Sequence, residues 1–452
     1  MGAGRRSRAD RRAGGERGRR AAHGGNRVVT AHGDVWRPSA SLRIAAIGAI
    51  VLAGGGIATA RPDLIALAVP LALWAILQRP RSTDPIEPLT IAVRSQAAQQ
   101  QGRLREEIVV SGAGEIAELS ITQAERRKTR VVVPVSSTIL ADSRPGHSGP
   151  VEAVRVIGRS AAGDGARIAG ETVPVTARRT VTPAMRMLPR LPLAPRLTGL
   201  HGAHEGSRPG QGGDFRDIHP FAPGDELRRV DWRATARAAR RPGELLVRRT
   251  HTLSDASVVL AVDTAEDLGE VVATWGGDDL SRAGTTSLDL AREAARSLAA
   301  AAIAVGDRVA YHALAPGGRS VRGATGSRHL ARLTTAIAAT GAAGDDRRYR
   351  RTPPVPHGSV IAVLSTFFDG AAAELALMWR AAGHRVIAVD TLPDLDRGRL
   401  SPQQSLALRI VLAEREDIFA GLAEAGVETL RWAADPAVAL TALARARTGG
   451  RR

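Results

Sequence analysis

The segment GGDFRDIHPFAPGDELRRVDWRATARAARRPGELLVRR, residues 212–249, is the most information-dense part of the chain. Acids and arginines alternate in it and surround Phe215, Phe221 and Trp232, although aromatic residues make up only 3% of the chain. A solvated, salt-bridged loop and helix has no need of such aromatics. Two readings therefore compete with it: a self-paired, partly buried network that fixes one loop geometry, or a docking surface.

Local signals divide this segment into a turn, a helix and a strand. Pro223-Gly224 indicates a turn, because proline presets φ at the second turn position and glycine tolerates positive φ. The pattern predicts a helix over 227–239, which Pro242-Gly243 ends, and then a short strand over 245–247. Each carboxylate has arginine neighbours, which would keep it ionised and favours structural pairing over acid–base work.

The run FRDIHPFAPGDELRRVDWRATAR, followed by LLVRR, resembles the signature of the bacterial family called domain of unknown function 58. His219 departs from the arginine that is common at that position. The resemblance implies a von Willebrand factor A-like domain after the signature. It also implies association with MoxR-type AAA+ ATPases in a chaperone-like or complex-assembly role. The signature residues that we expect to form the docking surface are Phe215, Arg216, Asp217, Pro223, Gly224, Asp225, Arg229, Asp231, Trp232 and Arg237.

Length and composition limit the classes of protein. A chain of 452 residues predicts two or three domains. The absence of cysteine excludes disulfides, thiolate metal sites and cysteine nucleophiles. The net charge of +18 favours anionic partners. Much of this charge lies in residues 1–40, an arginine- and glycine-rich stretch that we expect to be a disordered basic tail. A cytoplasmic anchor is its favoured role, over an arm that binds nucleic acid.

Residues 41–81 predict a two-helix transmembrane hairpin. Two apolar runs, 44–60 and 64–77, are separated only by Arg61-Pro62-Asp63. The first has about the minimum length of a membrane span, and the second is short. Arginines on both outer flanks predict a two-pass protein of the bacterial inner membrane, with both termini and the soluble domains in the cytoplasm. The alternative is a buried hairpin in a soluble protein.

Residues 82–195 predict a β-rich, sandwich-like module. Short β-like runs alternate with glycine, serine and polar stretches, as is typical of antiparallel sandwiches. Residues 196–250 form the signature segment, which begins with a glycine- and histidine-rich stretch, 199–213, expected to be a mobile loop. The runs expected to be strands are 89–93, 107–111, 129–135, 151–157 and 171–175.

Residues 251–452 alternate apolar strands with helices, which predicts a doubly wound, mostly parallel α/β sheet. Ligands on such a sheet bind at the carboxyl ends of its strands, where Asp263, Asp369 and Asp390 lie. The expected strands are 256–262, 307–314, 359–365, 385–390 and 427–432, and the expected helices are 288–305, 328–340, 371–382, 405–425 and 436–447.

A von Willebrand A-like domain implies a Mg²⁺ site of the form D-x-S-x-S, completed by a threonine and an aspartate from other loops. This chain offers Asp263, Asp267, Thr325 and Asp369, all with the oxygen ligands that Mg²⁺ prefers. Ala265 replaces the first serine and has no ligand atom, so the site is degenerate. A metal-free domain that binds protein is the equal alternative.

No phosphate-binding loop of the G-x-x-x-x-G-K-[ST] kind, no H-E-x-x-H and no nucleophile elbow occurs in the sequence. We therefore expect no enzymatic activity, but a membrane-anchored interaction scaffold that acts with a MoxR-type AAA+ ATPase. The alternatives are a metal-dependent hydrolase that uses Asp263, Asp267 and Asp369, or binding of nucleic acid by the arginine-rich tail. Specific recognition of nucleic acid is not expected.

Overall fold

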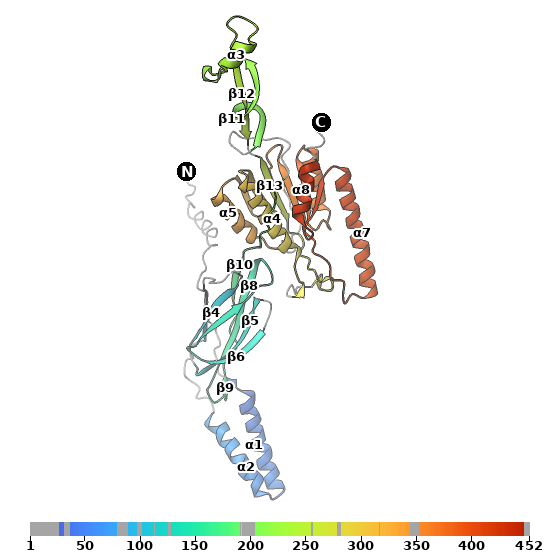
Figure 1. Cartoon of the computed structure of the whole chain (residues 1–452). Helices are drawn as coiled ribbons and strands as arrows, with labels where there is room; N and C mark the ends of the chain where they lie inside the picture. The colour runs from blue at the N-terminus through green and yellow to red at the C-terminus, as the bar shows by residue number, and fades with distance from the viewer. Residues whose placement is uncertain are drawn as a thin grey trace, which may run out of the picture. The chain divides into compact units, whose positions relative to one another are not determined.

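The computed structural model describes residues 27–30, 37–78, 89–96, 102–112, 114–124, 128–189, 191, 204–254, 256–277, 282–315, 317–343 and 352–446. Most of the tail expected to be disordered over 1–40 lies outside these ranges, but the expectation is wrong for residues 27–30 and 37–38, which form paired strands. The chain divides into two compact units, which Figure 1 draws together and which are described separately below. The first comprises Met1–Arg144 and Glu152–Arg178, and the second comprises Pro145–Val151 and Arg179–Arg452.

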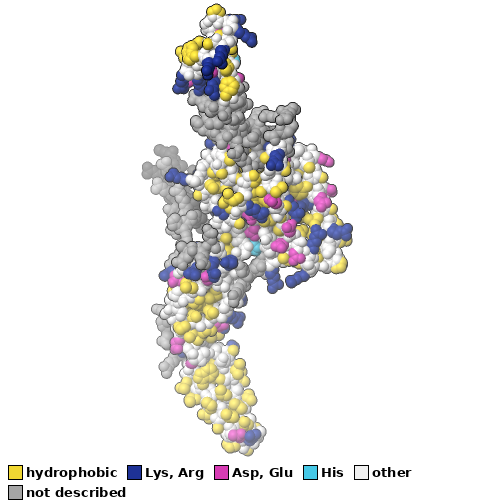
Figure 2. All heavy atoms as spheres, in the orientation of Figure 1, with side chains coloured by type: hydrophobic (Ala, Val, Ile, Leu, Met, Phe, Trp, Pro, Cys, Tyr) yellow, Lys and Arg dark blue, Asp and Glu magenta, His cyan; other side chains and the backbone are white. Residues whose placement is uncertain are grey.

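The first unit contains two packed helices, α1 (Ala40–Ala58) and α2 (Pro62–Leu77) (Figure 1). Ser39 caps α1 by accepting a hydrogen bond from the Leu42 amide at 3.1 Å. Gly56 lets the helices approach closely, since a Cβ there would lie 2.7 Å from Cγ1 of Ile65. Hydrophobic side chains cover most of the visible surface of both helices (Figure 2). Within the described residues, α1 is the one helix long and apolar enough to cross a bilayer, and α2 is apolar but shorter.

The remainder of this unit is two antiparallel sheets that share one hydrophobic core, built from residues such as Ile91, Ile108, Leu119 and Val156. The first sheet has the order β1 (Arg27–Thr30), β3 (Thr90–Ser95), β4 (Leu104–Ser111) and β7 (Thr138–Ser143). The second has the order β2 (Arg37–Pro38), β9 (Arg167–Ile168), β8 (Gly149–Ala161), β5 (Ile116–Gln123) and β6 (Lys128–Pro134), and β10 (Val175–Val181) pairs with β8.

Several sequence expectations for these sheets need correction. The strand expected over 171–175 is wrong, because β10 begins only at Val175. Strands β5 and β7 were not expected. Strand β5 places polar side chains on alternate positions, and the apolar run of β7 is only three residues long, so neither has the long continuous apolar run that marks a buried strand.

The second unit contains a six-stranded sheet whose order is β15, β14, β13, β16, β17, β18. Five strands are parallel, and β15 pairs antiparallel with β14 at one edge. The strand bounds are β13 (Ser257–Asp263), β14 (Arg308–Leu314), β15 (Ser320–Ala324), β16 (Val360–Ser365), β17 (Arg385–Asp390) and β18 (Glu428–Arg431). The short edge strand β15 was not expected.

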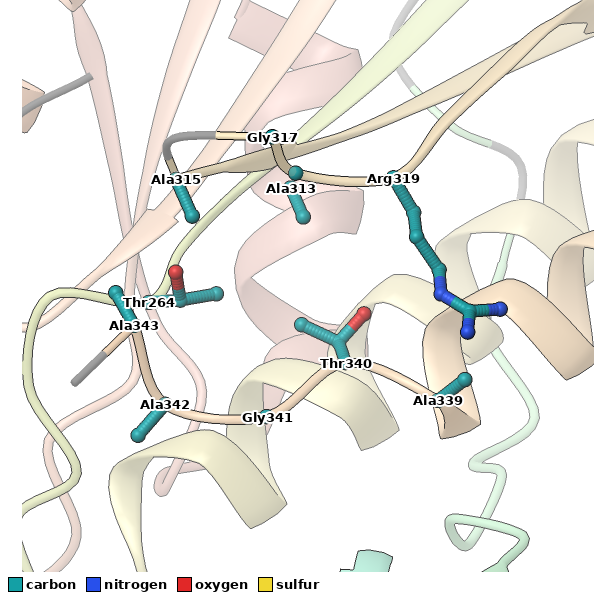
Figure 3. Close-up of a pocket in the computed structure, with 11 residues that line it drawn as sticks. Thr264, Ala313, Ala315, Gly317, Arg319, Ala339, Thr340, Gly341, Ala342 and Ala343 are labelled. Atoms are coloured by element: carbon teal, nitrogen blue, oxygen red, sulfur yellow. The ribbon is translucent and has the colours of Figure 1, made fainter. Parts of the chain in front are cut away.

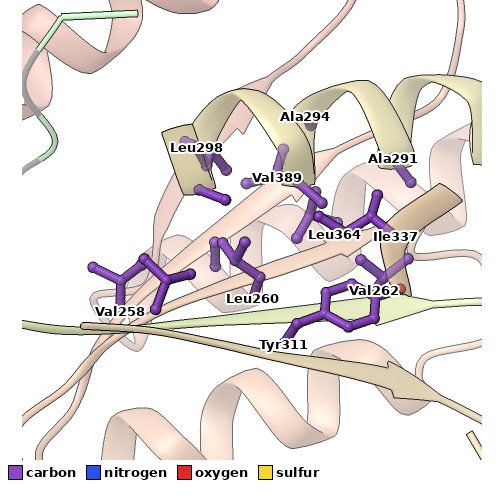
Figure 4. Packing of buried hydrophobic residues seen from close by; sticks show 14 of the residues in the cluster. Val258, Leu260, Val262, Ala291, Ala294, Leu298, Tyr311, Ile337, Leu364 and Val389 are labelled. Atoms are coloured by element: carbon purple, nitrogen blue, oxygen red, sulfur yellow. The ribbon is translucent and has the colours of Figure 1, made fainter. Parts of the chain in front are cut away.

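Helices pack on both faces of this sheet. Alternate residues of β13 point to opposite faces: Val258, Leu260 and Val262 join one core, while Val259 and Ala261 join the other. The first core, shown in Figure 4, contains Leu298 of the helix next to the sheet. On that face lie α4 (Ser287–Ala304), α5 (Ser327–Ala338) and α8 (Pro436–Ala446), and on the other lie α6 (Ala371–Ala381) and α7 (Pro402–Glu424).

The signature forms a two-stranded hairpin of β11 (His204–Pro220) and β12 (Leu246–Ser254). Its end carries the 3₁₀ turn η2 (Leu227–Arg229) and α3 (Trp232–Ala238). The loop expected over 199–213 is corrected for its described part, because residues from His204 onward pair with β12. The single helix expected over 227–239 is divided in two, because Asp231 begins a new helix as its N-cap.

Candidate functional site

The centre of the α/β sheet brings together the ends of its two middle strands. Strand order reverses between β13 and β16, and ligands bind open α/β sheets at such a point. Ser365, the last residue of β16, donates a 2.7 Å hydrogen bond to Oδ2 of Asp263, the last residue of β13. The Ser365 hydroxyl in turn accepts the Phe367 amide at 2.9 Å. Phe367 has a φ of +58°, so this contact holds a left-handed turn that a buried phenylalanine adopts only under constraint.

The carboxylate of Asp263 is buried and hydrogen-bonded within the chain. Its Oδ1 accepts the amide of Ala265 at 3.0 Å. Burial raises the pKa of Asp263 above its usual value, and the negative charge of Asp369 adds to this rise. Asp369 itself is exposed and accepts the Ala371 amide at 3.2 Å at the start of α6. Two of the four predicted metal ligands, Asp263 and Asp369, therefore lie at the same edge of the sheet.

The other two predicted ligands lie elsewhere. Asp267 accepts the Leu288 amide at 3.2 Å at the first turn of α4, where burial raises its pKa. Thr325 follows β15, whose Ala324 pairs with Val309 at the amino end of β14. Asp263 instead pairs with Leu314, five residues further along β14, or about 17 Å. The antiparallel direction of β15 thus places Thr325 at the opposite edge of the sheet.

The remaining donor set fits a hard divalent cation only in part. Within the described residues, no group of three or more His, Cys, Asp or Glu side chains is arranged to hold a metal ion. The hydroxyls of Ser365 and Thr366 could supplement the carboxylates, but Thr366 already donates to Glu266 at 3.2 Å. Most of these oxygens are thus used in bonds within the chain. The hydrogen bonds of Asp263, Ser365 and Thr366 tie the two loops together.

Arg415 of α7 also lies at this edge of the sheet, and no local sequence pattern predicted its role. Its Nε donates to the Thr366 carbonyl at 2.6 Å, and its guanidinium forms an ion pair with Asp390. The same guanidinium lies 4.7 Å from the ring centroid of Phe419 and 5.4 Å from that of Phe368. Asp390, which the sequence placed at a strand end, is therefore neutralised within the fold.

A cavity of about 230 Å³ lies beside Asp263, where Thr264 follows β13 (Figure 3). Its walls are mostly alanine and glycine, with Thr264, Thr340 and Arg319 as the polar side chains. Thr340 bonds to the Tyr311 hydroxyl at 2.5 Å, and burial raises the pKa of Tyr311 to about 12. None of the described residues that line the cavity is a carboxylate, so these residues offer neither an acid–base pair nor a set of hard metal ligands.

Asp289 on α4 anchors the segment 145–151. It accepts His147 Nδ1 at 2.7 Å, the Ser148 amide at 2.7 Å and the Ser148 hydroxyl at 2.9 Å. Burial alone would raise the pKa of Asp289, but the bonds from His147 and Ser148 outweigh it and the pKa lies below the usual value. Arg292, which is buried, donates to the Ser148 carbonyl at 3.0 Å and to the Thr340 carbonyl at 2.8 Å. No local sequence pattern reveals this network.

The acids of the signature hairpin are engaged within it. Asp231 caps α3 by accepting the amides of Arg233 and Ala234 at 3.1 and 2.9 Å. Asp225 accepts the Ala222 amide at 2.9 Å and lies 3.7 Å from Arg249. This turn needs Gly224, whose φ is +98°. The carboxylates therefore brace the loop that follows Pro223.

Other predicted residues line the two strands or the 3₁₀ turn. Asp217 pairs opposite Arg249 in the β11–β12 ladder. The position of Arg216 falls within β11, and Arg229 lies 3.4 Å from Glu226. Phe215 is half exposed under the guanidinium of Arg248, at 5.5 Å.

The apolar and basic side chains at the end of the hairpin point to solvent. Leu227 and Trp232 are both 66% exposed. Arg233 and Arg237 are exposed on α3, and neither forms an ion pair with any described residue. Figure 2 shows hydrophobic and arginine side chains adjoining one another on this end of the hairpin. We call Leu227, Trp232, Arg233 and Arg237 the hairpin surface.

Comparison with known proteins identifies one part of the chain. Residues 217–400 match the family described as "Protein of unknown function DUF58". No curated protein and no solved structure matches the chain. The match begins within the signature hairpin and continues through β13, α4, β14, β16 and β17. It therefore confirms, for residues 217–400, the resemblance to this family that the signature indicated.

Proposed function

We propose that the protein is a membrane-anchored scaffold for protein interactions. The observation that carries this proposal is that the acidic and the apolar side chains of the signature hairpin have different environments. Its carboxylates Asp225 and Asp231 are used inside the turn and the cap, whereas Trp232 and Leu227 are exposed. A tryptophan flanked by arginines is typical of the energetic centre of a protein interface. The exposed end of the hairpin would thus be a docking surface, and the hydrogen bonds of Asp225 and Asp231 would hold it in one conformation.

The α/β region would serve as a von Willebrand A-like platform without catalytic chemistry. The strand order, with an antiparallel edge strand β15, and the acidic loop after β13 support this likeness. Asp263 and Ser365 bond to each other, and Asp267 accepts the Leu288 amide in the first turn of α4, so the loops keep their geometry through contacts within the chain. We propose that Mg²⁺ is not needed for that geometry.

Helices α1 and α2 would anchor the scaffold as a two-pass hairpin in the bacterial inner membrane, with both termini and the soluble parts in the cytoplasm. The length and apolar surface of α1 support insertion, and the close approach at Gly56 supports a paired hairpin. The 16 residues of α2 would span about 24 Å, so it would need a locally thin bilayer or flanking residues that reach the interface.

A MoxR-type AAA+ ATPase is the partner that the family resemblance suggests, in the assembly or maturation of other complexes. The test is co-purification of such an ATPase with the tagged full chain from native membranes. A matched preparation carries Arg322→Ala, an exposed arginine on β15 far from the hairpin in sequence. Recovery of the ATPase with both proteins supports the proposal, and recovery with neither contradicts the partner.

A further inference from the structure

The outer face of α7 is complementary to the hairpin surface in both apolarity and charge. Helix α7 turns Leu408, Arg415 and Leu422, which repeat every seven residues, toward the sheet. Leu406 and Ile410 lie on the opposite side and are 55% and 51% exposed. This is unusual for a helix of a soluble region, because a helix normally buries such a stripe.

Acids continue the same stripe of α7. Residues 406, 410, 414 and 417 follow one another at spacings of four, four and three, so they share one helix face. Glu414 and Asp417 are exposed and form no ion pair with any described residue. The stripe from Leu406 to Asp417 is about 16 Å long, apolar at one end and acidic at the other. We call these four residues the α7 surface.

The hairpin surface has the opposite charge and a matching spacing. Arg233 and Arg237 are four residues apart on α3, or about 6 Å along its axis, and Glu414 and Asp417 are about 4.5 Å apart. Thr235 points the other way, since its hydroxyl accepts the Leu246 amide at 2.9 Å. Trp232 directly precedes Arg233 on α3, and hydrophobic and arginine side chains adjoin one another at this end of the hairpin (Figure 2). In the same way, Leu406 and Ile410 precede the acids on one face of α7.

We propose that the hairpin surface of one copy of this chain docks on the α7 surface of a second copy. The inference rests on the proposed role of the hairpin as a docking surface and names the surface that it contacts. Trp232 and Leu227 pack on Leu406 and Ile410, and the two arginines pair with Glu414 and Asp417. Because each copy carries one surface of each kind, two copies can exchange hairpins, or several can close a ring.

The sequence contains no cysteine, so introduced cysteines report contacts without background. Two versions of the full chain in detergent micelles are mixed, one tagged with Ala236→Cys on α3 and one untagged with Ala413→Cys on α7, and treated with a short bis-maleimide. Both positions are exposed and neither contributes a charge. The expected product is a tagged–untagged dimer. The control pairs Arg322→Cys with Ala413→Cys and should give none.

Charge reversal supplies the second measurement. R233E/R237E and E414R/D417R should each weaken self-association about tenfold or more, and mixing the two variants should restore it. High salt should weaken the wild-type assembly, since the pairs are exposed.

A monomeric wild-type chain overturns the inference, as does the absence of the tagged–untagged dimer or a mixture of the charge-reversal variants that fails to restore association. Membrane retention and ATPase recovery are measured separately, so this failure is distinguishable from failure of the proposed function.

Discussion

Ser365 donates its hydroxyl hydrogen to the carboxylate of Asp263 across 2.7 Å and so ties the carboxyl end of β16 to that of β13. This bond lies where the strand order of the sheet reverses, the position at which α/β proteins usually bind a ligand. Here the polar groups at that position satisfy each other. Two surfaces of the described chain, the hairpin surface and the α7 surface, instead leave apolar and charged side chains exposed.

Ser365→Ala should destabilise the α/β region by about 2 kcal/mol, because it leaves one oxygen of buried Asp263 and the Phe367 amide without their bond. Hydrogen exchange in the full chain should rise in β13 and β16. Asp369→Asn is the matched control, since Asp369 is exposed and asparagine can still cap α6. Equal exchange in both variants would show that the Ser365 bond stabilises nothing.

Mg²⁺ should bind the full chain no more tightly than about 1 mM, because only Asp263 and Asp369 of the four predicted ligands share one edge of the sheet. Calorimetric titration of Mg²⁺ and Mn²⁺ beside the double variant Asp263→Ala/Asp369→Ala checks this. Micromolar binding that the double variant abolishes would establish a metal site and refute the metal-free platform.

Asp289→Asn should cost about 2–3 kcal/mol at neutral pH, since Asp289 accepts bonds from His147 and Ser148 as an anion. The folded pKa of Asp289 is lowered, so its contribution is complete above the usual value of 3.8 and fades as the pH falls through the lowered pKa. Hydrogen exchange of α4 in wild type and variant should therefore converge in acid.

Asp267→Asn is the control, because its expected effect on stability at neutral pH is opposite to that of Asp289→Asn. Burial raises the pKa of Asp267, so stability falls as the pH rises above the usual value of 3.8, and the loss is complete above the raised pKa. The asparagine variant keeps an acceptor for the Leu288 amide and should be at least as stable as wild type at neutral pH. A stabilising effect of Asp289→Asn, or a pH-independent difference from wild type, would contradict the assigned charge state.

Helix α1 should retain the protein in membranes during alkaline carbonate extraction, and deletion of residues 40–77 should release it. Gly56→Val tests the pairing of α1 with α2, because its Cβ would meet Ile65 and the Arg61 carbonyl. We expect this variant to stay in the membrane with faster exchange in the α1–α2 turn. Gly54→Val is the control, since a Cβ there meets nothing within 4 Å. Release of the wild-type chain by carbonate would rule out the membrane anchor.

The α/β region was predictable because its strands are buried on both faces and appear as continuous apolar runs. The expected strand 385–390 coincides with β17, and the expected helix 371–382 extends one residue beyond α6. Antiparallel strands such as β5 were missed because one of their faces is polar. Strand β11 was missed because glycine and histidine have little strand propensity, and only its pairing with β12 orders it.

Only the site residues that directly end or follow a predicted strand could be placed from the sequence. Asp263 and Asp369 lie at or just after the ends of apolar strands, so any parallel arrangement of those strands places them at the same edge of the sheet. The direction of β15, which removes Thr325 from the site, depends on pairing between strands. Arg415 and Arg292 act from the middle of helices on loops far away in sequence, so their roles appear only in the folded chain. The signature predicted a brace and a docking surface as alternatives, and the two functions fall on different residues of the hairpin.

The most direct test of the docking surface is Trp232→Ala beside Asp231→Ala, both in the full chain, with self-association and hydrogen exchange measured in the same preparation. Asp231→Ala removes the cap of α3 and should cost about 1 kcal/mol, with faster exchange in α3. Trp232→Ala removes only exposed surface, so we expect unchanged exchange in α3 and β12 but loss of association. Faster exchange throughout α3 and β12 with association intact would show that Trp232 braces the hairpin, which contradicts the account.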